Sequence, residues 1–446
     1  MSLERTASLF RMARRNVRRH VRHARSAVLA LAVGFVAFGL FQGYLATMLD
    51  QQATNVSDRH MLGDLLVERA GSGTPEAAED PWRFALDEPE QAFIDRWLAA
   101  RFGDRAVRVR MLRGLGLAGT GGSGAIALMS GTDVAEGAIV RRAWRWNVTA
   151  GRPLQEAGGD AAVLGLGLGA VLDCALPDGV RAVDALGDDG VLVAAERPFV
   201  CRRDRVQLTA TTVSGQTNVI DLPIAGLLDG GAQEIDQRIV ELPLPVLQRL
   251  LDTKAVTRVA VRLPEGSDLD EVAAALVGDA KAAGFDLAAL PWSEHPLGEL
   301  YRQARSLLDT YRDLVTLIVC VIAGLSVLTA MMRSVAERIR EIGTLRALGY
   351  LRRHVVALFA MEAGLLGLVG VAIGLVVCVA LTAALNGAGI TYRAGVMAHP
   401  IPLTLGYEPG AWLAGGAALA GLAMLAAVLP ARRAVKRAIP DALAST

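Results

Sequence analysis

Residues 314–332 read LVTLIVCVIAGLSVLTAMM, an apolar stretch without a single charged side chain. About 20 such residues are needed for a helix to cross the roughly 30 Å hydrocarbon core of a bilayer. Three other stretches of the 446-residue chain meet the same requirement. The sequence therefore predicts four transmembrane helices, at residues 27–49, 311–333, 355–385 and 411–430.

The composition supports membrane insertion. Hydrophobic residues make up 52% of the chain, which is high for a soluble protein of this length. The formal net charge of only +1 provides no basic field for a nucleic acid. The first apolar stretch is too long for a secretory signal and lacks a small-residue cleavage site, so we expect it to remain as a span.

Arginine residues are concentrated on one side of the predicted spans. Eight arginines precede the first span, six lie between spans two and three, and a further basic cluster follows span four. Basic short loops mark the cytoplasmic side of a membrane. An arm for nucleic acid is the alternative for the N-terminal cluster, but its position directly before a span favours a role in orientation. We therefore expect the basic segment 1–26, the loop 334–354 and the tail 431–446 in the cytoplasm, with residues 50–310 and the short loop 386–410 outside it.

Most of the polar sequence lies in residues 50–310, here called the α/β domain. A helix is predicted at 268–283, because Asp268 can cap its start and Val272 and Leu276 recur at helical spacing. Alternating apolar residues predict strands at 64–68, 107–112, 205–209 and 256–263. The expected fold class is a membrane protein of four transmembrane α-helices with a large mixed α/β extracytoplasmic domain inserted between helices 1 and 2.

Helical extensions of the spans are expected to form a stalk for the α/β domain. Residues 296–314 favour a helix that leads into span two, and span one is expected to extend through about Val56. Cys174 and Cys201 both lie in the α/β domain, and they form a candidate disulfide if that domain faces an oxidising compartment. Their spacing alone does not show that the two Cα atoms come close enough to be bridged.

Motifs of catalysis are absent from the sequence. There is no Gly-x-x-x-x-Gly-Lys-Ser/Thr loop for a nucleotide, no His-Glu-x-x-His and no Gly-x-Ser-x-Gly. Only six scattered histidines and four cysteines occur, which argues against a metal site. We therefore expect no catalytic residue, no metal ligand and no directly bound cofactor.

Glu362 is the one charged residue within the apolar stretches 27–49, 314–332, 355–385 and 411–429. Carboxylates inside a membrane are costly and are often functional. The alternative is that Glu362 lies close to the cytoplasmic boundary and pairs with an arginine of the preceding loop. The sequence leaves both interpretations open.

The loop between spans two and three contains a regular apolar pattern. Over residues 334–349, Ile339, Ile342 and Leu345 recur at helical spacing, with Leu348 next and charged residues on the other faces. This pattern predicts a short amphipathic helix that ends at Gly349. Such a helix lies on lipid or docks in a partner's groove, and the modest size of its apolar residues favours docking.

The same residues resemble a known family. Residues 337–349, which read ERIREIGTLRALG, resemble the coupling-helix motif of FtsX/MacB-type ABC transporter permeases, the mechanotransmission superfamily. Glu362 with the glycines that follow it resembles the third span of these proteins, and residues 430–443 resemble their tail. The residues expected by this resemblance to bind the ATPase are Glu337, Arg338, Arg340, Glu341, Ile342, Leu345, Arg346, Leu348 and Gly349.

The resemblance implies a non-catalytic permease subunit in a bacterial inner membrane. ATP and Mg would be held by a separate cytoplasmic ABC ATPase, and the permease would pair with a second copy or a paralogue. Outside the cytoplasm it would meet an adaptor, a lipoprotein or a hydrolase, and within the bilayer membrane lipid.

Three roles remain open at the level of the sequence. The leading one is transmission of ATP-driven motion for lipoprotein or lipid release, or for tripartite efflux. The alternatives are an FtsX-like activator of a cell-wall hydrolase and a membrane sensor that works without an ATPase.

Overall fold

The computed structural model describes residues 11–16, 21–187, 192–231, 233–392 and 401–436. The chain divides into two compact units. One unit holds Met1–Leu49, Arg305–Gly389 and Thr404–Thr446, and the other holds Asp50–Ala304 and Ile390–Leu403. Residues 1–10 and 17–20 of the predicted basic segment, 393–400 of the predicted short loop and 437–446 of the predicted tail lie outside the described residues.

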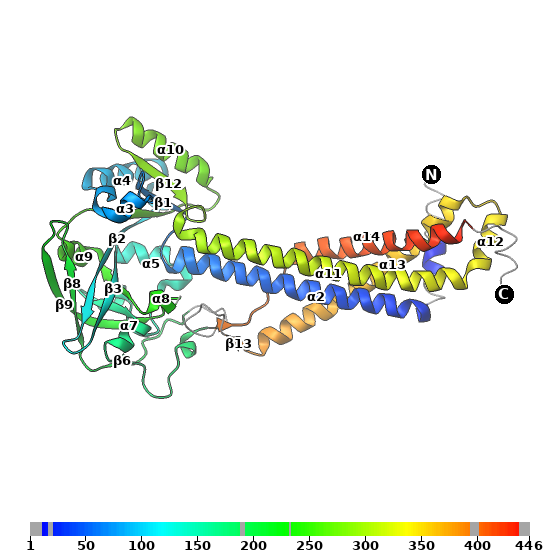
Figure 1. Cartoon of the computed structure of the whole chain (residues 1–446), viewed down its shortest axis with the longest axis horizontal. Helices are drawn as coiled ribbons and strands as arrows, with labels where there is room; N and C mark the ends of the chain where they lie inside the picture. Colours follow the sequence, from blue (N-terminus) through cyan, green and yellow to red (C-terminus); the bar gives the residue numbers. More distant parts are fainter. Residues whose placement is uncertain (1–10, 17–20, 188–191, 232, 393–400, 437–446) are drawn as a thin grey trace. The chain divides into compact units, whose positions relative to one another are not determined.

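Four long helices dominate the first unit, and Figure 1 shows them running alongside one another. In the part of the chain that the structure describes, these four helices are long and apolar enough to cross a membrane. The prediction of four spans is confirmed. The helices are α2 (Val21–Thr54), α11 (Glu299–Glu337), α13 (Arg352–Gly387) and α14 (Pro409–Ala434).

Glycines bring α13 and α2 close together. A Cβ added at Gly370 would lie 2.8 Å from the Cβ of Leu31, and one added at Gly374 would lie 2.8 Å from the carbonyl oxygen of Ala32. Small residues four apart allow this approach of two helices in a bilayer, where dispersion and not water exclusion drives association. The Gly370-x-x-x-Gly374 pattern therefore marks the contact between α2 and α13.

The α/β domain is built around one ten-stranded sheet. Four of its strands are antiparallel in the order β12-β1-β11-β2. With two helices they follow a split β-α-β-β-α-β order, in which residues 120–257 replace the usual hairpin between the second and third strands. The elements are β1 (Leu65–Arg69), α4 (Glu88–Phe102), β2 (Val107–Gly119), β11 (Arg258–Arg262), α10 (Leu269–Ala282) and β12 (Leu287–Pro291).

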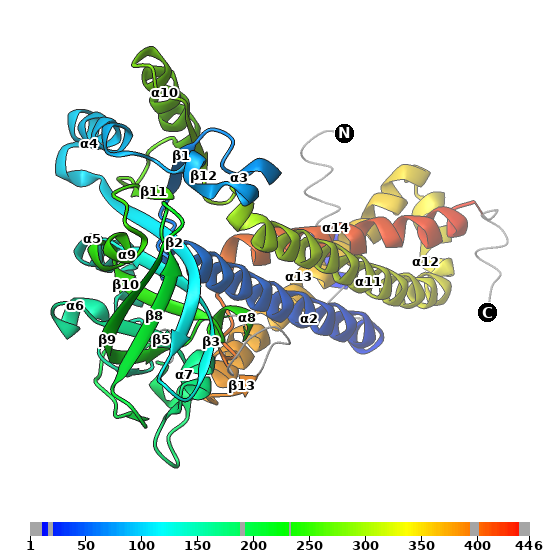
Figure 2. The same ribbon diagram turned by 60° about the vertical axis from the view of Figure 1, so that its left-hand side comes forward.

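The inserted residues form a closed ring of strands together with β2, and Figure 2 shows these strands from the side. Each strand pairs with the next around the ring, in the order β2, β3, β10, β5, β9, β8 and back to β2. A closed ring leaves no unpaired sheet edge between its members. The added strands are β3 (Gly124–Thr132), β5 (Ala162–Gly165), β8 (Arg205–Thr211), β9 (Thr217–Leu228) and β10 (Ile239–Pro243).

Short elements surround this framework. The α-helices are α3 (Pro75–Glu79), α5 (Val134–Val140), α6 (Leu154–Ala157), α7 (Leu166–Val171), α8 (Gln233–Asp236) and α9 (Leu244–Leu251). The remaining strands are β4 (Ala150–Gly151), β6 (Cys174–Ala175), β7 (Val200–Cys201), β13 (Thr391–Tyr392) and β14 (Ile401–Pro402). A π-helical turn, Asn55–Arg59, directly follows α2.

The predicted strands and helix of the α/β domain are found, and the largest difference in length is at β2. β1, β2, β8 and β11 lie on the four predicted strands, and α10 lies on the predicted helix. The carboxylate of Asp268 accepts the backbone N–H groups of Asp270 and Glu271, as a cap should. β2 does not end at Leu112 but continues to Gly119, because both β3 and β8 pair with its second half.

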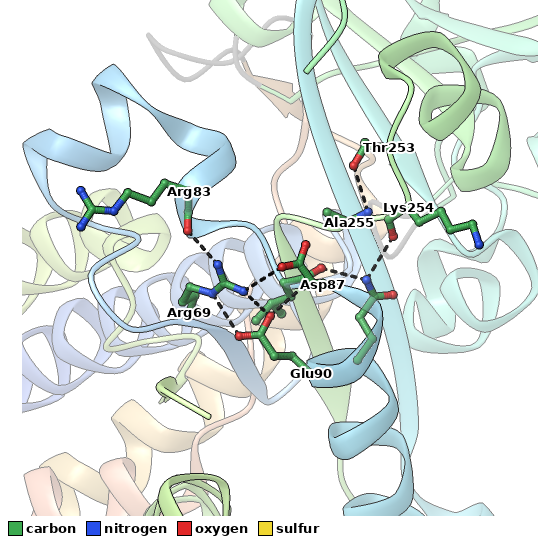
Figure 3. Close-up of polar contacts among 9 residues, drawn as sticks. Arg69, Arg83, Asp87, Glu90, Thr253, Lys254 and Ala255 are labelled. Carbon is green, nitrogen blue, oxygen red and sulfur yellow. Dashed lines mark hydrogen bonds and ion pairs between the residues drawn. The ribbon is translucent and has the colours of Figure 1, made fainter. Parts of the chain in front are cut away.

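An ion pair fixes the start of α4 against β1 (Figure 3). The Arg69 guanidinium donates to the carboxylate of Glu90, with an Nε–Oε1 distance of 3.0 Å, and to the backbone carbonyl of Arg83. Glu90 also accepts the backbone N–H of Asp87 in a capping box. One arginine thus joins the first strand to the helix that covers it.

Candidate functional site

The loop between α11 and α13 contains a short helix, α12 (Ile339–Ala347). The prediction of one helix from Ser334 to Gly349 is corrected at its start, because Ser334–Glu337 continue α11 without a break. The helical path is interrupted at Arg338, whose φ and ψ are −111° and 19°. At the other end Gly349 has a φ of +90°, a conformation that favours glycine and terminates the helix.

The apolar stripe of α12 faces the neighbouring helices. Ile342 is only 2% exposed and packs in a cluster with Val335 of α11 and Phe359 of α13. Leu345 is half-buried and packs against Leu358 of α13. Ile342 and part of Leu345 are thus covered by the chain itself, so a partner that docks on α12 would have to contact its other side.

The opposite side of α12 is open. We call its exposed residues the coupling face, and Leu348 is its main apolar member at 73% exposed. Charged groups flank this leucine, so the face is mixed in character and not a continuous apolar patch. The coupling face consists of Arg340, Glu341, Thr344, Ala347 and Leu348.

A buried ion pair lies at the base of α12. The Arg338 guanidinium approaches both carboxylate oxygens of Glu362, and Nη1 donates to them over 3.0 Å and 2.9 Å. The two side chains are 7% and 3% exposed. The guanidinium carbon also lies 5.1 Å from the ring centre of Phe359, within the range of a cation–π contact. Of the two interpretations of Glu362, pairing with an arginine of the loop is the one observed.

Arg338 was expected on a face of the helix other than the apolar stripe, among the residues that bind the ATPase, whereas in the structure its side chain is buried. Because the helical path breaks at this residue, its side chain turns inward to Glu362. Its Nε also donates to Glu341 over 2.8 Å, which links the buried pair to the coupling face. The lone carboxylate within span three was the signal in the sequence for such a partner.

The other predicted site residues lie at the surface or at the helix ends. Glu337 is the last residue of α11 and is exposed, Arg340 is exposed, and Arg346 is half-buried in the last turn of α12. Gly349 lies beyond the coupling face and serves as the helix terminator. The structure thus brings the predicted residues together around one helix, with different exposures.

Cys174 and Cys201 form a disulfide in the α/β domain. They face each other as paired residues of the short strands β6 and β7, and their Cα atoms are 4.0 Å apart. The bond closes a loop that contains residues 188–191, which lie outside the described part of the chain. Among the residues that the structure describes, no group of three or more His, Cys, Asp or Glu side chains is placed to hold a metal ion.

These features define a multi-pass membrane protein with a large α/β domain between its first two spans and a surface helix between its second and third. Residues 314–439 match the family model described as FtsX-like permease C-terminal. The C-terminal part of the chain, which contains the last three spans and α12, is therefore similar to FtsX-like permeases.

Two solved structures are similar to parts of the chain. The extracellular domain of the noncanonic ABC-type transporter YknZ from Gram-positive bacteria is 13% identical, covers 50% of this chain and 99% of its own, and superposes with a TM-score of 0.31. The periplasmic region of MacB from Actinobacillus actinomycetemcomitans is 9% identical, covers 52% of this chain and 89% of its own, and has a TM-score of 0.32. No curated protein matches the sequence.

Proposed function

We propose that this chain is the permease subunit that transmits ATP-driven motion from a separate cytoplasmic ATPase to the α/β domain. The observation that carries the proposal is the construction of α12. Its inner side is fixed to the spans by the pair of Arg338 and Glu362, while its outer side leaves the coupling face open. A docking helix needs both properties, because force applied to a loosely held helix would not reach the spans.

The contacts of α12 support a path for this force. Ile342 packs in one cluster with residues of α11, α13 and α14, including Val335, Phe359 and Ala431. A displacement of α12 would therefore move three spans together. α11 has 39 residues, which corresponds to about 58 Å at 1.5 Å per residue, and it continues unbroken from Glu337 to Glu299 in the α/β domain.

We further propose that both termini are cytoplasmic and that the α/β domain is periplasmic. The distribution of arginines supports this orientation. The disulfide between Cys174 and Cys201 is consistent with it, because disulfides persist in oxidising compartments such as the periplasm. In this orientation the α/β domain would act in lipoprotein or lipid release, or in tripartite efflux, as part of a pair of permeases.

Co-purification from the native membrane tests the ATPase partnership. A tagged chain should recover an ABC ATPase, and Leu348→Asp should reduce this recovery at least about tenfold, since tenfold corresponds to only about 1.4 kcal/mol of binding energy. Leu115→Asp is the matched control, because Leu115 is similarly exposed at 68% but lies in the α/β domain. Equal recovery with both variants, or no ATPase with the unaltered chain, would refute the proposal.

A further inference from the structure

A cavity of about 220 Å³ lies within the α/β domain. One wall is a face of the sheet, on which Arg113 of β2, Ser130 of β3 and Glu241 of β10 are neighbours in register. The opposite wall is the segment that follows α2, including Asn55 and His60. The cavity therefore lies between the sheet and the helical extension of span one.

Most of the cavity wall is apolar. Its exposed surface is dominated by aliphatic and methionine side chains, several of which are almost fully buried. A wall of this kind favours a hydrocarbon ligand over water, since apolar cavities remain dry and bind apolar molecules. The apolar residues at opposite sides are Met111, Leu128 and Ile239 on the sheet, and Val56, Met61 and Leu297 on the covering segments.

Arg113 and Glu241 line the polar end of the cavity, and two further arginines lie close to it. Arg59 is paired with Asp229 over 3.5 Å, and Arg141 is paired with Glu241 over 2.6 Å. Arg113 differs from these two, because its Nε is buried and meets no hydrogen-bond acceptor among the described residues. A buried donor without an acceptor is unfavourable.

The protonation states agree with a cationic site. Burial, together with neighbouring Arg258, lowers the pKa of Arg113 to about 10, so that it remains protonated at neutral pH. Burial, together with Arg59, Arg113 and Arg141, lowers the pKa of His60 to about 3. A neutral His60 adds no further cation, and a carboxylate at this end would find an arginine ready to donate.

We propose that this cavity binds a medium-chain aliphatic carboxylate, with its carboxylate on Arg113 and its chain between the sheet and the segment after α2. The planar guanidinium matches the geometry of a carboxylate with two parallel donors. A cavity of about 150 Å³ holds benzene, with its six carbon atoms, so this one holds a chain of about nine or ten non-hydrogen atoms. Octanoate, with ten, is the probe of matching size.

Photolabelling of the full chain in lipid nanodiscs tests this proposal. The probe is hexanoate with a diazirine in its chain, which has the same ten non-hydrogen atoms as octanoate, and labelled peptides are mapped by mass spectrometry. Labelling should be saturable on the segments 111–130 and 231–241, and unlabelled octanoate should compete with it. Labelling confined to the apolar spans, or without competition, would overturn the proposal.

Variants and analogues separate the charged contact from simple partition into a hydrophobic space. Arg113→Met should reduce cavity labelling at least about tenfold, whereas Arg203→Met, which removes an exposed arginine of the same domain, should not change it. Should Arg113→Met fail to fold, competition on the unaltered chain decides: octanoate should compete at least tenfold better than 1-octanol and better than octyl phosphate. Equal competition by 1-octanol, or stronger competition by octyl phosphate, would refute a carboxylate site.

Discussion

Removal of the carboxylate from the buried pair should strongly destabilise the span unit, which is the unit built from Met1–Leu49, Arg305–Gly389 and Thr404–Thr446. Glu362→Gln keeps the shape of the side chain but leaves the charge of Arg338 buried and only partly compensated. With charges about 4 Å apart and an effective dielectric constant of about 20, the pair is worth about 4 kcal/mol. Breaking a buried pair typically costs about 3–5 kcal/mol.

The lower end of that range applies here. Arg338 keeps its second partner, Glu341, over 2.8 Å, but the Glu341 side chain is 57% exposed and water screens its contribution. We therefore expect Glu362→Gln to lower the free energy of unfolding by about 3 kcal/mol. The assay is equilibrium unfolding of the purified chain in mixed detergent micelles with increasing SDS.

A double variant distinguishes a broken pair from a damaged helix. Arg338→Met combined with Glu362→Leu removes both charges and should recover most of the loss, because apolar replacements of a buried pair are often neutral. Asp184→Asn is the control, since its partner Arg181 is at the surface and the pair is open to water. If the double variant were as unstable as the sum of its two single variants, the reasoning about the pair would be wrong.

Three further predictions follow from the described geometry. Cys174→Ser should lower the stability of the α/β domain by about 3–4 kcal/mol, given the separation of 27 residues, and a thermal melt with and without reductant checks it. Gly370→Leu should disrupt the contact of α2 and α13 and lower the SDS midpoint, while Gly387→Leu, where nothing lies within 4 Å of an added Cβ, should not. The pKa of His60 is lowered from 6.5 to about 3, so its contribution to stability is complete above pH 6.5 and is lost as the pH falls toward 3, at up to about 1.4 kcal/mol per pH unit. In His60→Gln the pH dependence of the melting temperature should be flatter over that window, and an unchanged slope would contradict the assignment.

Hydropathy was sufficient to predict the spans, because a bilayer imposes one length and one composition on every crossing helix. It was also enough for α10, where Asp268 provides a local capping signal. The loop between spans two and three shows what the spacing of apolar residues cannot predict. The spacing of Ile339, Ile342 and Leu345 shows that they share a side of a helix, but only the fold shows that this side faces the spans.

The cavity could not be predicted for a related reason. Residues 114–124 are rich in glycine, which is typical of a loop, and the predicted strand ended at Leu112. In the structure Gly114 and Gly116 belong to β2. A Cβ added at Gly114 would crowd the side chain of Leu251, and one added at Gly116 would collide with the backbone of Thr209. The absence of side chains at these glycines allows β8 and α9 to lie close to β2. The strand that carries Arg113 can therefore continue past Leu112.

The most direct test of force transmission is a site-specific crosslink at the coupling face. A photoreactive phenylalanine analogue at position 348, introduced in the native host, should crosslink to an ABC ATPase, and the yield should change when ATP is trapped by vanadate. The same analogue at position 115 should give no such product. Crosslinks from position 348 to lipid alone, or to proteins without a nucleotide-binding motif, would contradict the account.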